Sequence, residues 1–281
     1  MADDTSLEAE ERADGVRRYF APDPVTPDPP GTQAERTVLL CAGALGVVGV
    51  VLLFAAPVFG VLLCLAAAAL GGSAGRRLLA ARKLAERARA AYRARLLDTE
   101  NRPADGVVDG WLEGSLRRAV DVGWRELGMR GPFGGLGSAE LQLVGVPRLF
   151  PGVTGRVGAD GRLRLNAYQI TVLYLTDRKL CVFQCELNMA SGGLRYATTH
   201  EFLRPHLSTL TTGHGSTALP VAGPDGTEAR PVTTLAFELG AAGATVATEI
   251  PVAADGASVE WLSAPSLHAV AEIRRQLDWT G

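Results

Sequence analysis

The feature that most constrains the fold of this chain is an uncharged run of 39 residues, from Thr37 to Gly75. A helix rises 1.5 Å per residue, so about 20 residues cross the roughly 30 Å apolar core of a bilayer. The run is nearly twice that length, and Pro57 lies at its midpoint. We therefore expect two antiparallel helices, at about residues 37–55 and 58–75, joined by a tight turn near Pro57. One long, tilted and kinked helix is the alternative.

Small residues recur along both predicted helices. They are Gly43, Gly46 and Gly49 in the first helix, and Ala67, Gly71 and Gly75 in the second. Such spacing lets helix backbones approach closely in lipid. It also fits the composition of the whole chain, which contains 33 glycines, so both interpretations stay open.

A basic segment follows the uncharged run directly. Between residues 76 and 95 eight cationic side chains face a single acid, Glu86. Lys and Arg next to a span resist translocation, so we expect this end in the cytoplasm. Because a hairpin returns both ends to one side, we expect two spans with both termini cytoplasmic. A cleavable signal peptide is not expected, since 36 mostly polar residues come first.

The cations nearest the uncharged run are the candidate contacts for lipid headgroups. They are Arg76, Arg77, Arg82, Lys83 and Arg87. Each suitably placed cation gains about 1 kcal/mol beside anionic lipid. Nucleic acid is the competing ligand for such a segment. We do not expect it as a partner, because no aromatic stacking platform or known reader motif accompanies the arginines.

The chain divides into four predicted segments. Residues 1–36 carry four Arg against nine acids and five prolines, and we expect a disordered acidic, Pro-rich tail. Residues 37–75 form the transmembrane hairpin. Residues 76–130 form a basic juxtamembrane helix and an amphipathic linker helix at about 107–127, which we expect to pack on the following domain rather than lie on the membrane. Residues 131–281 form a β-rich domain.

In this last segment the sequence changes to a period of two. Residues 181–188 alternate apolar and polar side chains, which is typical of a strand with one buried face. Pro265 and Ser266 would occupy N-terminal capping positions of a final helix. We expect strands at 163–165, 168–176, 181–187, 235–239 and 246–250, and a C-terminal helix at 267–277.

Several antiparallel strands closed by one amphipathic helix resemble a pleckstrin-homology-like (PH-like) small barrel. The segments 168–176, 180–185 and 199–210 are similar to a group of uncharacterised bacterial membrane proteins with a two-helix transmembrane hairpin and a cytoplasmic PH-like domain. The chain departs from that group around Pro205, which implies an edge strand or a bulge. The resemblance implies a bacterial plasma membrane, but no activity and no ligand residues.

The expected fold class is therefore a membrane-anchored α+β protein. It consists of a transmembrane helical hairpin, linker helices, and an antiparallel PH-like β-barrel or roll capped by a C-terminal helix.

No motif in the sequence indicates catalysis. The stretch Gly131–Gly137 lacks the Lys-Ser/Thr ending of a phosphate-binding loop, and no Gly-x-Ser-x-Gly elbow is present. Three histidines, His200, His206 and His214, match no metal-ligand spacing. We therefore expect a protein that is not an enzyme, with no catalytic residue, no cofactor and no metal site.

Two pairs of reactive side chains are expected to be structural. Asp105 and Asp109 fall on a linker or a helix surface, where we expect solvated charges rather than an acid–base pair. Cys181 and Cys185, four residues apart on a strand, would lie about 13 Å apart, beyond disulfide reach, and we expect both to stay reduced.

The expected function is a non-catalytic membrane anchor or scaffold that presents its PH-like domain to a protein partner. The bilayer and a protein are the expected partners, with a homo-oligomer as a further option. Arg178 and Lys179 form a candidate loop for contacts with an anionic ligand. The alternative interpretation is a solvated turn. The alternative function is a membrane-active effector whose hairpins oligomerise and permeabilise the bilayer.

Overall fold

The computed structural model describes residues 2–27, 33–128, 139–176, 178–223, 226–241 and 243–277. The chain forms two compact units. One unit consists of Met1–Asp23 together with Asp98–Gly281, and the other consists of Pro24–Leu97. The first unit is thus assembled from both ends of the sequence, and the second is inserted into it.

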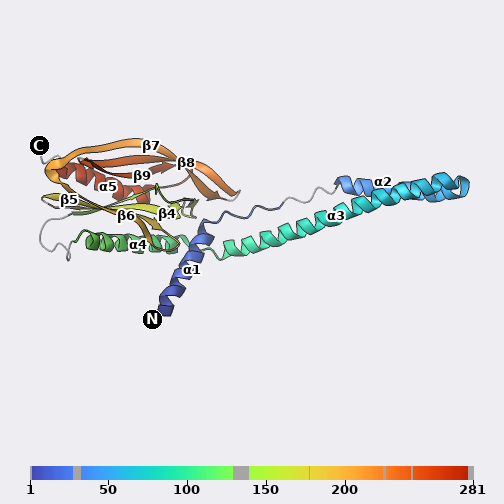
Figure 1. Ribbon diagram of the computed structural model, residues 1–281, viewed down its shortest axis with the longest axis horizontal. Helices are drawn as coiled ribbons and strands as arrows, with labels where there is room; N and C mark the ends of the chain where they lie inside the picture. Colours follow the sequence, from blue (N-terminus) through green and yellow to red (C-terminus); the bar gives the residue numbers. More distant parts are fainter. Residues whose placement is uncertain are drawn as a thin grey trace. The chain divides into compact units, whose positions relative to one another are not determined.

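The inserted unit is a helical hairpin. Helix α2 (Gln33–Ala55) and helix α3 (Pro57–Glu100) are separated by Ala56 alone and lie side by side (Figure 1). Pro57 opens α3, where its missing N–H would have no helical partner in any case. The predicted turn is confirmed, and the alternative of one long kinked helix is wrong. As predicted, α3 continues through the basic segment without a break.

Small residues allow α2 and α3 to pack closely against each other. A Cβ atom built on Gly71 would lie 3.6 Å from the Cβ of Ala42, and one built on Gly46 would lie 3.8 Å from the Cβ of Ala67. At Gly49 an added Cβ would lie only 2.9 Å from the Cys64 sulfur. These pairs are symmetric about the Ala56–Pro57 turn, so the two helices are in antiparallel register. Both are long and apolar enough to cross a membrane.

In the described part of the other unit, nine strands form two open sheets. The four-stranded sheet is antiparallel and has the order β1 (Ala139–Gly145), β4 (Ala167–Leu175), β5 (Lys179–Asn188), β6 (Leu194–Leu203). The five-stranded sheet has the order β3 (Leu163–Leu165), β2 (Gly155–Val157), β7 (Leu207–Gly223), β8 (Gly226–Ala241), β9 (Ala244–Ala254), and its β2–β7 pair is parallel. The α+β class is confirmed.

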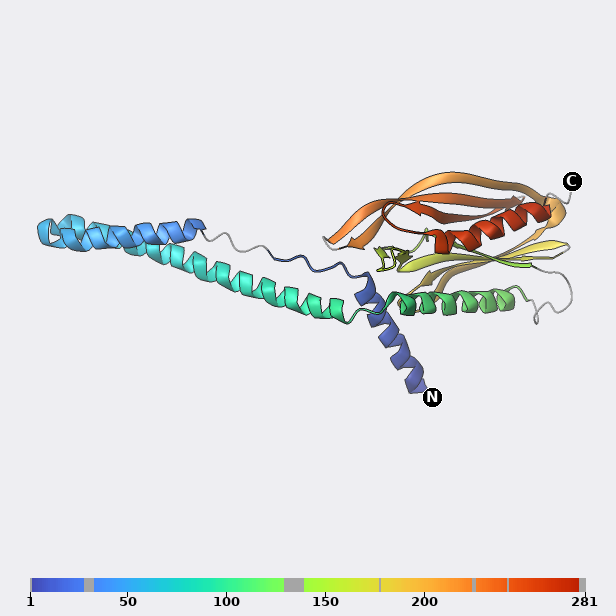
Figure 2. The same ribbon diagram turned by 180° about the vertical axis from the view of Figure 1, so that it is seen from behind.

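Helices separate and cover these sheets. Helix α4 (Asp105–Glu126) lies on the outer face of the four-stranded sheet, and helix α5 (Glu260–Leu277) lies between the two sheets (Figures 1 and 2). The predicted linker helix is therefore packed on the domain, as expected. Pro205 lies in the short 3₁₀ turn η1 (Arg204–His206), which carries the chain from β6, an edge strand, into β7 of the other sheet.

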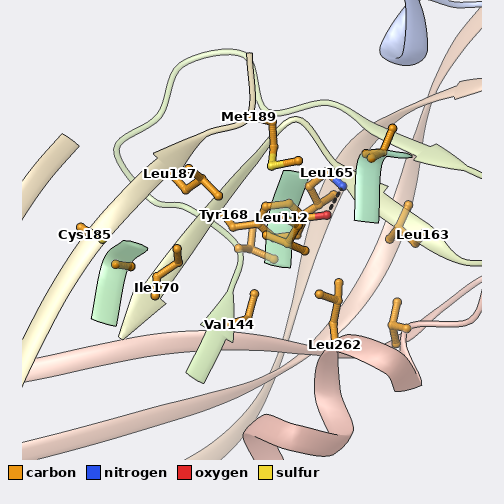
Figure 3. Close-up of a cluster of buried hydrophobic side chains, with 14 of the residues drawn as sticks. Leu112, Val144, Leu163, Leu165, Tyr168, Ile170, Cys185, Leu187, Met189 and Leu262 are labelled. Atoms are coloured by element: carbon orange, nitrogen blue, oxygen red, sulfur yellow. Dashed lines mark hydrogen bonds between the residues drawn. The ribbon is translucent and has the colours of Figure 1, made fainter. Parts of the chain in front are cut away.

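Because α4 covers one face and α5 with the five-stranded sheet covers the other, the central strands β4 and β5 of the four-stranded sheet are buried on both sides, whereas the edge strand β6 is mostly exposed. All nine residues of β4 are buried, and the prediction of one buried face for its neighbour β5 is wrong. Tyr168 and Ile170 of β4 pack with Leu112 of α4 in the larger core cluster (Figure 3). Leu173 and Leu175 point to the other face and pack with α5 and the five-stranded sheet.

Polar side chains on that inner face connect the two sheets. Gln169 Nε2 and Gln184 Nε2 each donate to the carbonyl oxygen of Ala247 on β9, at 2.9 Å. The hydroxyls of Thr171 and Thr248 lie 2.8 Å apart. Buried polar groups are costly unless they are paired, so these bonds hold β9 in register against the four-stranded sheet.

The prediction of disorder over residues 1–36 is wrong for the N-terminal part, where helix α1 (Ala2–Phe20) forms. Val16, Tyr19 and Phe20 are buried in the same cluster as α4 and the four-stranded sheet. Their spacing places all three on one helix face. The prolines begin only at Pro22, after the helix has ended.

The C-terminal helix begins earlier than predicted. Helix α5 starts at Glu260, and Pro265 lies inside it. Ser266 therefore caps no helix. Its hydroxyl instead donates to the carbonyl of Leu262 and accepts the backbone N–H of Val144 on β1, at 3.0 Å.

Candidate functional site

A buried arginine is the centre of the charged interior of the β-rich unit. The Arg164 side chain on β3 is 1% exposed. Its Nε lies 2.6 Å from Asp109 Oδ1, and its Nη2 lies 2.8 Å from both Asp109 Oδ2 and Asp160 Oδ2. The guanidinium also lies 5.7 Å from the ring centre of Trp261, within range of a cation–π contact.

The pKa values follow from this pairing. Burial acts to lower the pKa of Arg164, but hydrogen bonds to Asp160 and Asp109 outweigh it and leave that pKa raised. The hydrogen bonds from Arg164 in turn lower the pKa of Asp160. The predicted solvated charge at Asp109 is wrong, since this side chain is an ion-pair partner and is 28% exposed.

The same cluster reaches the N-terminal helix. The hydroxyl of Tyr19 donates to Asp105 Oδ1 at 2.7 Å, and Asp105 Oδ2 accepts the backbone N–H of Ala159 at 2.8 Å. Burial, followed by this hydrogen bond, raises the pKa of Tyr19. A Cβ at Gly158 would lie 2.4 Å from Arg164 Nη1, so the turn fits only because it carries no side chain there. We name this group, Tyr19, Asp105, Asp109, Asp160 and Arg164, the Arg164 cluster.

Two further arginines hold the C-terminal end of α1. Arg102 and Arg156 each donate to Asp23 Oδ1, at 2.9 and 2.8 Å, and each donates to the carbonyl of Ala21. Burial acts to raise the pKa of Asp23, but hydrogen bonds from Arg156 and Arg102 outweigh it and lower that pKa. Cations near the last carbonyls of a helix also interact well with its dipole.

Next to the Arg164 cluster lies a cavity of about 370 Å³. Its floor is apolar and includes Leu112 of α4, Val144 of β1 and Leu262 of α5, three members of the hydrophobic cluster drawn in Figure 3. The remaining lining residues are Asp109, Glu113, Leu116, Gln142, Arg162, Trp261 and Pro265. A cavity of this size, mostly apolar with a few polar groups, is typical of binding pockets.

Comparison with models of known protein families, with curated proteins and with solved structures gives no match. The arguments for function therefore rest on the geometry of the chain.

The predicted lipid-contact residues all lie on α3 and are exposed. At 100° per residue, Arg76, Lys83 and Arg87 share one face, whereas Arg77 and Arg82 point to two others. The cations therefore form a collar around the helix rather than a single stripe.

The predicted anionic-contact loop offers fewer available charges than expected. Lys179 Nζ lies 2.6 Å from Glu201 Oε2 on the neighbouring strand β6, and this hydrogen bond raises the pKa of Lys179. Arg178 is exposed, and its carbonyl accepts the backbone N–H of Arg204 at 3.0 Å. Asp177 lies outside the described residues, as does the stretch Gly131–Gly137.

The remaining sequence candidates fall in structural settings. His200 lies on β6, His206 in η1 and His214 on β7, and no cluster of potential metal ligands occurs among the described residues. Cys181 and Cys185 are free and buried, and burial raises the pKa of Cys185 to about 12. Sequence reasoning missed the Arg164 cluster, for which the alternation of Arg164 with two leucines gave no signal.

Proposed function

We propose that this protein is a non-catalytic membrane anchor and scaffold. Its hairpin of α2 and α3 crosses a bilayer twice and presents the β-rich unit to a protein partner on one side of the membrane. The observation that carries the proposal is the docking of α1, which precedes the hairpin, into the unit that follows it. Two segments that pack together lie on the same side of a membrane, so the intervening hairpin must cross an even number of times.

The basic collar supports a cytoplasmic location for that side. Eight cations follow the apolar part of α3 within 20 residues, a pattern that resists translocation. We propose that the exposed cations from Arg76 to Arg87 contact anionic headgroups of a bacterial plasma membrane. With the hairpin supplying membrane affinity, the β-rich unit is left to bind a partner.

The scaffold role is supported by how the unit uses its charges. Arg164, the most buried cation among the described residues, holds α4 and the β2–β3 turn together through its ion pairs with Asp109 and Asp160. The likeness to PH-like domains is likewise a proposal, supported by a C-terminal helix that packs against β1 and β9.

Reporter fusions on the full chain test the topology. We expect reporters at the N-terminus and the C-terminus to be active in the cytoplasm, and a reporter inserted between Ala56 and Pro57 to be active outside. Alkaline carbonate should leave the wild type in the membrane fraction and release a variant that lacks residues 37–75. Termini on opposite sides, or extraction of the wild type, would refute the anchor. Dye leakage from liposomes carrying the full chain would favour the effector alternative.

A further inference from the structure

We propose that two copies of this chain associate through strand β7, whose open edges pair antiparallel about a two-fold axis at His214. The pairing joins the five-stranded sheets of the two copies into one continuous sheet. It goes beyond the scaffold function, because it needs only the β-rich unit and names a second copy of the chain as a partner of that unit.

Strand β7 is open along most of one edge. It pairs with β8 from Leu207 to Gly223, whereas β2 covers its other edge only at Val221 and Ala222. Among the described residues, no backbone hydrogen bond from another element reaches that edge between Thr209 and Leu219. Most side chains of this stretch are exposed. We name residues 209–219 the open stretch of β7.

A proline shows which backbone groups point out of this edge. Ala218 pairs with Pro231 of β8, which has no N–H and cannot complete a hydrogen-bonded pair. The backbone groups of Ala218 therefore point away from β8, and those of alternate residues along the strand point the same way. The residues of the open stretch that share this direction are Leu210, Thr212, His214, Ser216 and Ala218. Each of them offers an N–H and a carbonyl oxygen to a further strand.

The open stretch lacks the features that protect other sheet edges. Charged side chains, prolines, bulges and short strands normally prevent an edge from pairing. Among the described strands, the edge strand β6 carries Arg195 and Glu201 and is irregularly paired, and the edge strand β3 has only three residues. Strand β7 contains no Asp, Glu, Lys or Arg. Its bulge at Ser208 and its Pro220 lie just outside the two ends of the open stretch.

These two limits select a second copy as the occupant. Ser208 and Pro220 are equally far from His214 in the sequence, so a two-fold axis at His214 matches the whole open stretch of one copy with that of the other. The sequence is nearly the same in both directions from the axis, Thr211-Thr212-Gly213 on one side and Thr217-Ser216-Gly215 on the other. Thr212 of one copy then lies opposite Ser216 of the other, and such hydroxyl pairs stabilise neighbouring strands. An isologous contact of this kind closes at two copies.

The charges beside β7 also suit this pairing. The β8 residues that pair with Thr212–Thr217 run from Phe237 to Val232, and none of them is charged. Charged neighbours of the open stretch include Glu238 beside Thr211, Arg230 beside Leu219, and Arg274 of α5, which donates to the Thr212 hydroxyl. The two-fold axis places the end that carries Glu238 and Arg274 opposite the uncharged Val232–Thr233 segment of the other copy. The two His214 imidazoles meet at the axis, where one can donate to the other.

Cysteine cross-linking of the full chain in its membrane tests the register. In a hydrogen-bonded antiparallel pair the two Cα atoms lie about 5.5 Å apart, which is within disulfide range. With the native cysteines replaced, His214→Cys should therefore form an intermolecular disulfide on mild oxidation. Ser216→Cys is the matched control, because the two Ser216 positions lie four residues apart along the strands, about 13 Å, and should not cross-link. A disulfide with Ser216→Cys and none with His214→Cys would overturn the axis at His214.

Energy transfer between donor- and acceptor-labelled full chains in liposomes measures the strength of the association. His214→Asp places two carboxylates together at the axis, and we expect the dissociation constant to rise at least about 20-fold. Thr233→Asp is the matched control. It adds the same charge at an exposed position of the central strand β8, away from the axis, and should change the dissociation constant less than about twofold.

A proline variant tests the main-chain bonds separately. Ser216→Pro removes an outward N–H that β8 does not use, so the sheet should survive while the dissociation constant rises about tenfold. Thermal unfolding within about 3 °C of the wild type confirms that each variant is folded. No energy transfer between wild-type copies, or transfer that His214→Asp and Ser216→Pro leave unchanged, would overturn the pairing. The topology test decides the anchor on single copies, so it can fail or succeed independently of this result.

Discussion

Replacing Arg164 with methionine would leave the carboxylates of Asp109 and Asp160 without their shared cation. Removing one partner of a buried ion pair costs about 3–5 kcal/mol. The Asp160 side chain is 37% exposed, so solvent screens that half of the cluster, and we expect about 3 kcal/mol. In a unit of this size each kcal/mol shifts the midpoint by about 2–4 °C, so Tm should fall by about 6–12 °C.

The pH dependence of this loss provides the sharper test. Arg164 lowers the pKa of Asp160 in the folded state. Such a carboxylate stabilises the fold above its unfolded pKa of about 3.9, and this stabilisation is lost as the pH falls toward the folded pKa. The difference in Tm between wild type and Arg164→Met should therefore be largest at neutral pH and shrink below about pH 4.

The assay is thermal unfolding of the full chain in detergent, followed by tryptophan fluorescence at neutral pH and at about pH 3.5. Arg117→Met is the matched control. It removes an exposed ion pair between Arg117 and Glu113, one turn apart on α4, and should lower the free energy of unfolding by less than about 0.5 kcal/mol. A Tm within 2 °C of the wild type at neutral pH, or a difference that does not change with pH, would refute the reasoning.

Three further outcomes are expected. With the native cysteines replaced, Ala42→Cys combined with Gly71→Cys should form a disulfide on mild oxidation, because the 3.6 Å between the two Cβ positions falls within the range of disulfide geometry. The control is Ala42→Cys alone, for which non-reducing gels should show no intramolecular bond. Glu186→Gln should raise Tm by about 2–4 °C. Residues 169 and 186 are directly paired, and Glu186 Oε2 and Gln169 Oε1 are both buried without a hydrogen-bond partner, so the new amide can donate to Gln169 and stabilise the fold by about 1 kcal/mol. An unchanged Tm would contradict this. Cys185 should resist alkylation in the native protein and react only in denaturant, because burial raises its pKa to about 12; rapid native labelling by mass spectrometry would show the site to be open.

The hairpin and the linker helix could be predicted because their signals are local. An uncharged run of known length with a central proline determines two arms, and helical spacing of apolar residues determines α4. Helix α1 was missed because composition was averaged over residues 1–36, which mixes a proline-free helix with the Pro-rich segment after it. The partners of Tyr19 and Phe20 also come from residues far along the chain, which no local window contains.

The Arg164 cluster could not be found for a similar reason. A strand pattern of Leu163-Arg164-Leu165 predicts an arginine that points away from a buried face, and solvent is the ordinary surrounding for such a side chain. Here α4 covers that side, and its Asp109 meets the arginine there. Whether this charge is buried depends on which helix packs over the strand. The residues around the strand do not determine that, so local sequence could not predict the burial.

The docking of α1 also has a consequence for how the protein is made. Arg12 of α1 donates to the carbonyl of Met189, which is 177 residues further along the chain. At about 5–20 residues per second, the ribosome needs roughly 10 to 35 s to supply that partner. During this interval the hairpin emerges and Tyr19 and Phe20 remain uncovered, so the nascent N-terminus is a ready client for chaperones. In the proposed topology, the fold can be completed only when both flanks of the hairpin lie on the side of the membrane where the chain is synthesised.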